Sequence, residues 1–130
     1  MNAATTRGGA KVRGEVMVVE DDFSIRETLR ELLEDEGFAV SWAANGRDAL
    51  ARLEAGDSPR LILLDLMMPV MNGVEFRSAQ QRDPRLSQIP VVVISAEHGL
   101  EQTASTMAVQ GFLAKPFELD ALLATVQRYC

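Results

Sequence analysis

Short apolar runs restrict the fold of this chain more than any other feature. Four of them occur in the sequence: Val16–Val19, Leu61–Leu64, Val91–Ile94 and Phe112–Ala114. The first three lack polar alternation, which is typical of strands buried on both faces of a parallel sheet. A weaker run, Ala39–Ala43, lies between Gly37 and the Asn45-Gly46 turn signal. We expect this run to form an edge strand.

The clearest helical pattern follows the first apolar run. Ser24 and Glu27 have the spacing of a capping box, and Gly37 stands where a helix C-terminal glycine is expected. Four apolar residues between them form one stripe: Ile25, Leu29, Leu32 and Leu33. The pattern therefore predicts a helix over residues 24–36.

Four weaker helical patterns separate and follow the remaining runs. They cover residues 47–55, 73–82, 99–109 and 118–128. In two of them we expect Val74, Phe76 and Leu119 to face the core. Five strands alternating with five helices imply right-handed crossovers, so the sequence predicts a doubly wound α/β fold with a five-stranded parallel sheet and helices on both faces.

Composition and charge narrow the class of protein. Apolar residues make up 47% of the 130 residues and charged residues 25%, and no apolar run is long enough to cross a membrane. The only cysteine, Cys130, has no disulfide partner within the chain. We therefore expect a soluble, cytoplasmic protein that does not act at a membrane.

The first 13 residues differ from the remainder of the chain. They hold three basic residues and no acid, so the net charge of −6 becomes −9 over residues 14–130. An acidic body should repel nucleic acid, and we expect no direct binding to it. The small, polar residues 1–13 suggest a flexible leader ahead of one domain over 14–130.

Charged or hydroxyl residues directly follow the four buried runs. These residues are Glu20-Asp21-Asp22, Asp65, Ser95 and Lys115. Because ligands bind beyond the carboxyl ends of the strands in sheets of this type, we expect these side chains to converge on one rim. The sequence therefore predicts a site with several carboxylates, a hydroxyl and an ammonium group.

Clustered carboxylates repel one another unless a cation lies among them. Oxygen ligands without histidine or cysteine favour Mg²⁺, which typically keeps open positions for phosphate oxygens. In phosphoryl transfer, Asp65 could attack while Mg²⁺ and Lys115 balance the charge of the moving group. Ser95 could donate a hydrogen bond to a phosphoryl oxygen.

The chain resembles a response-regulator receiver domain of two-component signalling over about residues 14–130. Four pieces carry the resemblance together: Glu20-Asp21-Asp22 after an apolar strand, the stretch Leu-Leu-Asp-Leu-Met-Met-Pro-Val-Met-Asn-Gly that ends at Gly73, the step Ile94-Ser95-Ala96, and Phe-Leu-Ala-Lys-Pro-Phe from Phe112 to Phe117. The fold implied is flavodoxin-like, with strand order 2-1-3-4-5.

The resemblance also implies roles for single residues. Asp65 would become an aspartyl phosphate, and Mg²⁺ would be held by Glu20, Asp21, Asp65 and the backbone carbonyl of Met67. Ser95 and Lys115 would contact the phosphoryl group, with a cis peptide bond before Pro116. Ser95 and Phe112 would form the switch.

The implied partners are a histidine kinase or histidine phosphotransfer protein as donor and a downstream protein that the sequence does not identify. Phosphorylation would change the surface of the fourth helix, the last strand and the last helix. The protein would not be an enzyme, apart from catalysing its own phosphorylation and dephosphorylation.

The same residues bear on three other functions. A receiver-like module that binds proteins without phosphorylation would be expected to lack part of the site, and every part is present. A Mg²⁺-dependent phosphatase would need a second aspartate two residues after the nucleophile, where Met67 stands. A flavin-binding protein would not place three carboxylates after its first strand, because they would repel the flavin phosphate.

Overall fold

We describe residues 14–96 and 100–130 in a computed structural model of the chain. Its strands are β1 (Glu15–Val19), β2 (Ala39–Ala43), β3 (Leu61–Asp65), β4 (Val91–Ser95) and β5 (Gly111–Ala114). Its helices are α1 (Phe23–Asp35), α2 (Gly46–Glu54), α3 (Gly73–Gln81), α4 (Leu100–Met107) and α5 (Leu119–Tyr129). The predicted leader over residues 1–13 lies outside the described residues.

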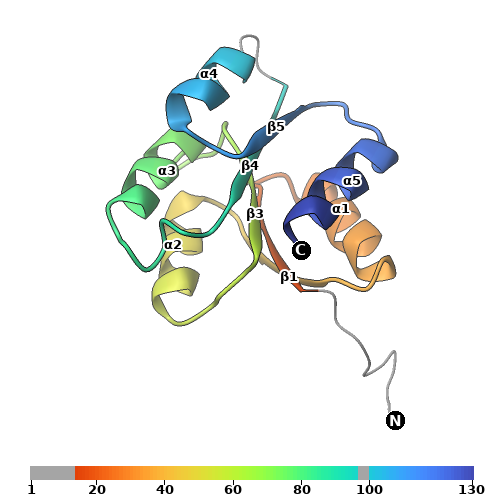
Figure 1. The fold of residues 1–130 in the computed structure, drawn as a ribbon, viewed down its shortest axis with the longest axis horizontal. Helices are drawn as coiled ribbons and strands as arrows, with labels where there is room; N and C mark the ends of the chain where they lie inside the picture. The colour runs from red at the N-terminus through yellow and green to blue at the C-terminus, as the bar shows by residue number, and fades with distance from the viewer. Residues whose placement is uncertain (1–13, 97–99) are drawn as a thin grey trace.

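The five strands form one parallel sheet in the order β2-β1-β3-β4-β5. Helices α1 and α5 cover one face, and α2, α3 and α4 cover the other (Figure 1). This arrangement confirms the predicted doubly wound, flavodoxin-like α/β fold. It also confirms that Ala39–Ala43 is an edge strand.

The three central strands form the core of the molecule. Their apolar residues are 0% exposed, and alternate side chains pack into two hydrophobic clusters, one on each face of the sheet. Phe76 from α3 fills one cluster, and Leu29, Leu33 and Leu122 from α1 and α5 fill the other. The unbroken apolar runs are explained by this burial on both faces.

The start of α1 differs from the prediction. The N-cap is Asp22, which has an extended backbone and accepts a hydrogen bond from the backbone N–H of Ile25 at 3.0 Å. Ser24 lies inside the helix, so the predicted capping box of Ser24 and Glu27 is wrong. Asp22 is an equally good cap, and it already has the extended conformation of the chain leaving β1.

Two side chains expected in the core are exposed instead. Val74 is 45% exposed in the first turn of α3, and Leu119 is 45% exposed in the first turn of α5. The buried face of α3 is formed by Phe76, Arg77 and Gln80. The apolar pattern alone therefore placed Val74 and Leu119 on the wrong face of their helices.

The fourth helix is shorter than the predicted segment 99–109. It begins at Leu100 and ends at Met107, and Ala108 follows with a positive φ of 56°. Residue 99 lies outside the described residues. A left-handed residue directly after the last helical residue is a common way to end a helix.

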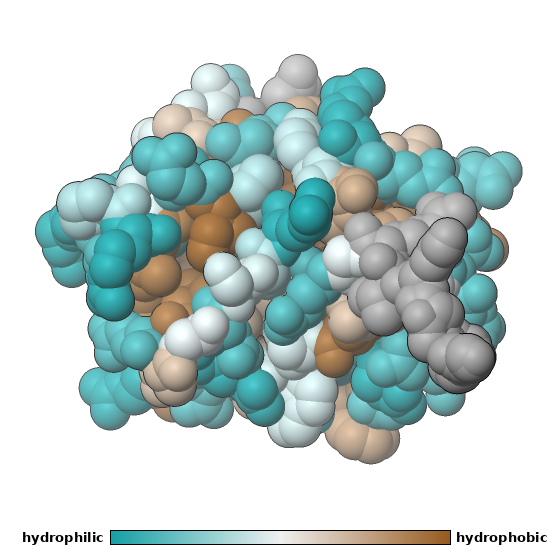
Figure 2. Space-filling view, turned by 60° about the horizontal axis from the view of Figure 1, so that its bottom comes forward, coloured by the Kyte–Doolittle hydropathy of each residue, from teal (hydrophilic) through white to brown (hydrophobic). Residues whose placement is uncertain are grey.

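One face of the molecule can be followed in a space-filling view (Figure 2). The face in Figure 2 is mostly hydrophilic, and its hydrophobic atoms lie mainly in recesses between polar side chains. Among the described residues, the helices are all too short or too polar to cross a membrane.

Candidate functional site

Parallel strand ends bring the predicted site residues to one rim of the sheet. Asp65 and Ser95 are the last residues of the adjacent strands β3 and β4, and Lys115 follows β5. Glu20 and Asp21 follow β1, the neighbour of β3 on its other side. A pocket of about 370 Å³ opens here, with Asp65, Ser95 and Lys115 in its lining.

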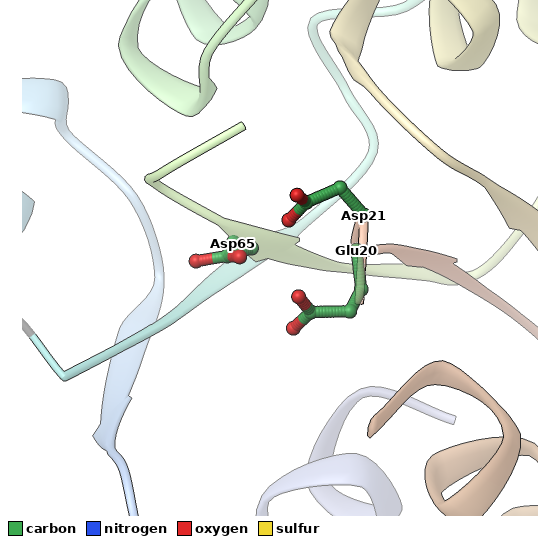
Figure 3. Close-up of side chains that lie close together, drawn as sticks. All are labelled: Glu20, Asp21 and Asp65. Atoms are coloured by element: carbon green, nitrogen blue, oxygen red, sulfur yellow. The ribbon is translucent and has the colours of Figure 1, made fainter. Parts of the chain in front are cut away.

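Three carboxylates form the centre of this site. One oxygen each of Glu20, Asp21 and Asp65 lies within 4.8 Å of the others. Figure 3 shows the three side chains reaching to the same side from the ends of β1 and β3. Glu20 and Asp65 are 1% and 4% exposed, whereas Asp21 is exposed. The cluster therefore combines two buried acids with one that faces solvent.

Lys115 supplies positive charge to the two buried acids. Its Nζ lies 2.9 Å from Oε1 of Glu20 and 3.7 Å from Oδ2 of Asp65. The peptide bond between Lys115 and Pro116 is cis, as the resemblance implied. One ammonium group cannot neutralise three carboxylates, so the cluster keeps an excess of negative charge.

The pKa of Asp65 reflects this excess. The pKa of the Asp65 carboxyl is raised to about 7, chiefly by burial and then by the hydrogen bond and the charge of the neighbouring Glu20 carboxyl, against the opposing effect of Lys115. A backbone hydrogen bond from Met67 to Oδ1 at 3.2 Å also favours the ionised form. A divalent cation among these oxygens would remove the repulsion. The donor set therefore fits a hard cation such as Mg²⁺.

The backbone around Asp65 is closely packed. The N–H of Gly73 donates to the carbonyl oxygen of Leu66 at 3.1 Å, which folds the β3–α3 connection back onto the strand end. Asn72 and Glu75 form a reciprocal capping box at the start of α3. This local structure fixes the position from which Asp65 points into the pocket.

Ser95 and Phe112 occupy different environments. Ser95 is 1% exposed at the rim, whereas Phe112 is 42% exposed on the edge strand β5, where it pairs with Val93. The predicted roles of these two residues as a switch are not tested by this geometry. The predicted backbone ligand at Met67 also stays a prediction, although Met67 adjoins the pocket.

Arg26 is a site residue that sequence reasoning missed. Its Nη1 donates to the backbone carbonyl of Glu20 at 3.0 Å, and its guanidinium carbon lies 4.1 Å from the ring centroid of Trp42. Arg26 is 7% exposed. Arg26 lies three and seven residues before Leu29 and Leu33, so it is on the buried face of α1. A charged residue on an otherwise apolar helix face was the sequence signal that could have identified it.

An apolar groove of about 450 Å³ adjoins the site between α1 and the β5–α5 connection. Its lining includes Ile25, Leu29, Leu32, Lys115 and Phe117. Lys115 and Ala96 line both this groove and the pocket at Asp65, so the two openings are neighbours.

Comparison with known proteins adds independent findings. A family model described as "Response regulator receiver domain" matches residues 16–127. A 14.6 kDa protein of Leptolyngbya boryana is 35% identical over 118 residues, which are 89% of each chain. The chemotaxis response regulator CheY4 of Vibrio cholerae has a similar solved structure, with a TM-score of 0.80, 35% identity and coverage of 89% of this chain and 98% of CheY4.

Longer regulators also match. Response regulator MprA of Mycolicibacterium vanbaalenii is 34% identical over 114 residues, which are 86% of this chain and 48% of MprA. The chain therefore spans about half the length of this regulator.

Proposed function

Because this chain belongs to the response regulator receiver domain family, we propose that it is a phosphoacceptor switch in which Asp65 receives a phosphoryl group. One observation carries the proposal. Asp65 is buried at the rim within one acidic cluster with Glu20 and Asp21, and the ammonium group of Lys115 is 3.7 Å away. A divalent cation would offset the excess negative charge of the carboxylates, and the cation and Lys115 together would balance the charge of an incoming phosphoryl group.

The proposed reaction is a direct transfer. An Oδ of ionised Asp65 attacks the phosphorus of a phosphohistidine or a small phosphodonor, the phosphorus–nitrogen or phosphorus–oxygen bond breaks, and the leaving group keeps the bonding electrons and takes up a proton. Glu20, Asp21, Asp65 and the carbonyl of Met67 would hold Mg²⁺, which supplies charge stabilisation when bound. Ser95 and Lys115 would contact the phosphoryl oxygens.

We propose a histidine kinase or a histidine phosphotransfer protein as the physiological donor. Hydrolysis of the aspartyl phosphate would reset the switch, so the chain catalyses only its own phosphorylation and dephosphorylation. The output would be a changed surface on α4, β5 and α5 that a downstream protein reads, with Ser95 and Phe112 as the moving residues.

The acidic body of the chain supports the proposal that nucleic acid is not a direct partner. The single cysteine supports a cytoplasmic location. The alternative of a turnover phosphatase is disfavoured, since Met67 takes the position where such an enzyme needs a second aspartate.

Phosphorylation is expected on one residue only. Incubation with Mg²⁺ and acetyl phosphate or phosphoramidate should add about 80 Da, the mass of a single phosphoryl group, as measured by intact-protein mass spectrometry. Asp65→Asn should abolish the addition, because an amide cannot form the acyl phosphate. Asp35→Asn, an exposed position at the end of α1, is the control that should keep it. An unchanged wild-type mass would contradict the proposal.

Lys115→Ala is expected to separate phosphorylation from the response to it. The variant keeps the three carboxylates and should still accept a phosphoryl group, but more slowly, by roughly tenfold or more, because one charge that balances the moving group is lost. It should also lose much of the change in the amide NMR spectrum of α4 and β5 upon phosphorylation. Equal spectral changes in wild type and variant at equal phosphorylation would exclude a coupling role for Lys115.

A further inference from the structure

Two polar side chains are buried on the core-facing side of α3, away from the acidic cluster. Arg77 is 4% exposed and Gln80 is 0% exposed. A buried arginine is usually paired with a carboxylate. Among the described residues, however, Arg77 forms no ion pair, and burial lowers its pKa. Its charge must therefore be stabilised by other acceptors.

Those acceptors lie at the C-terminal end of α4. The Nε of Arg77 donates to the carbonyl oxygen of Met107 at 3.2 Å, and Nη2 donates to that of Ala108 at 2.6 Å. The last carbonyls of a helix have no partner within the helix and carry partial negative charge. Arg77 thus caps α4 from a different helix, 30 residues earlier in the chain.

Gln80 extends the connection to the segment before β4. Its Oε1 accepts from Nη1 of Arg77 at 2.7 Å, while its Nε2 donates to the carbonyl oxygens of Leu86 and Ile89 at 2.9 and 3.0 Å. One further residue, Gln110, exchanges hydrogen bonds with Val91 at the start of β4. The end of α4 is therefore tied to α3 and to the start of β4.

We propose that Arg77 is a positioning residue that fixes the C-terminal end of α4, and that α4 is displaced about this fixed end when Asp65 is phosphorylated. The first half concerns the unphosphorylated chain alone, and the second half rests on the proposed function. The planar guanidinium suits this role, since it can donate to two carbonyls and to Gln80 at once.

Hydrogen–deuterium exchange of the full chain in Mg²⁺-free buffer tests the first half. In Arg77→Met, the amides of residues 104–110 should exchange faster by roughly tenfold or more, while β1 and β3 keep wild-type protection. In Arg77→Lys, the exchange rate of these amides should lie between those of the wild type and Arg77→Met. An ammonium group cannot donate to Met107, Ala108 and Gln80 at once in the way that the guanidinium does. The matched control is Arg82→Met, an exposed position at the end of the same helix.

Equal exchange of residues 104–110 in Arg77→Met and Arg82→Met would overturn the first half. If Arg77→Met loses protection from exchange throughout the chain, the test passes to Arg77→Lys. The first half then requires that amide exchange in Arg77→Lys is faster in residues 104–110 alone.

Hydrogen–deuterium exchange in the presence of Mg²⁺ and acetyl phosphate tests the second half, the displacement of α4. The phosphorylated fraction of each sample is determined by intact-protein mass spectrometry and kept equal between variants. In the wild type, exchange of residues 104–109 should stay constant while earlier amides of α4 change. In Arg77→Lys the change should extend into residues 104–109. A wild-type change that is uniform along α4 overturns the second half. A mass that does not increase contradicts the proposed function and the second half with it, and leaves the first half to be decided in the unphosphorylated chain.

Discussion

Replacing Gly73 with alanine is expected to lower the free energy of unfolding by about 3 kcal/mol and to slow phosphorylation of Asp65. A Cβ atom at this position would lie 2.6 Å from the backbone oxygen of Asp65 and 2.9 Å from the Cα of Leu66. Both are backbone atoms, so the clash can be relieved only by moving the end of β3. Urea unfolding followed by the fluorescence of Trp42 measures the stability.

Gly111→Ala is the matched control for this substitution. A Cβ atom there would meet only Cγ2 of Val92 at 3.8 Å, which is ordinary van der Waals contact. This variant should unfold within about 0.5 kcal/mol of the wild type and should be phosphorylated at the wild-type rate. Similar stabilities for Gly73→Ala and Gly111→Ala would show that the β3–α3 connection is less tightly packed than described.

Asp65→Asn is expected to stabilise the Mg²⁺-free protein at about pH 8. At this pH the Asp65 carboxyl, whose pKa is raised to about 7 by burial and by Glu20, is ionised beside other carboxylates. The neutral amide removes that repulsion. Water at the rim screens part of the repulsion between the carboxylates. We therefore expect the free energy of unfolding to rise by about 1 kcal/mol, or the Tm by roughly 5 °C.

The pH dependence of this gain has a definite sign. Because the pKa of Asp65 is higher in the folded state, the folded protein keeps a proton between about pH 4 and pH 7 that the unfolded chain releases, and wild-type stability falls as the pH rises through this range. The difference in stability between Asp65→Asn and the wild type should therefore become smaller as the pH is lowered towards about pH 5. Thermal unfolding at several pH values measures it. Asp35→Asn, which makes the same charge change at an exposed site, should show no such dependence, and an equal dependence in both variants would exclude the acidic cluster as its cause.

The strands and the site could be predicted from the sequence because burial on both faces of the sheet leaves an unbroken apolar run. Leu61–Leu64 ends directly at Asp65, and Val91–Ile94 ends directly at Ser95, so the last residue of each run marks the same rim. The parallel direction of the strands then brings these side chains together without any further information.

The residues that sequence reasoning missed are those whose surroundings come from distant segments. Arg77 and Gln80 occupy core-facing positions of α3, and their burial depends on acceptors in α4 and before β4. Asp22 and Ser24 are both good helix caps, and the path of the chain leaving β1 decides between them. Val70 has a positive φ of 67° in the β3–α3 connection, a conformation that its β-branched side chain gives no reason to expect.

The most direct test of the central claim is to locate the modified residue chemically. Borohydride reduces an aspartyl phosphate to homoserine, so protein treated with Mg²⁺ and acetyl phosphate, then reduced and digested, reports the acceptor by peptide mass spectrometry. The account predicts homoserine at position 65 and at no other aspartate. Unmodified Asp65, with homoserine at Asp21 or Asp22 or with phosphate retained on another residue, would contradict it.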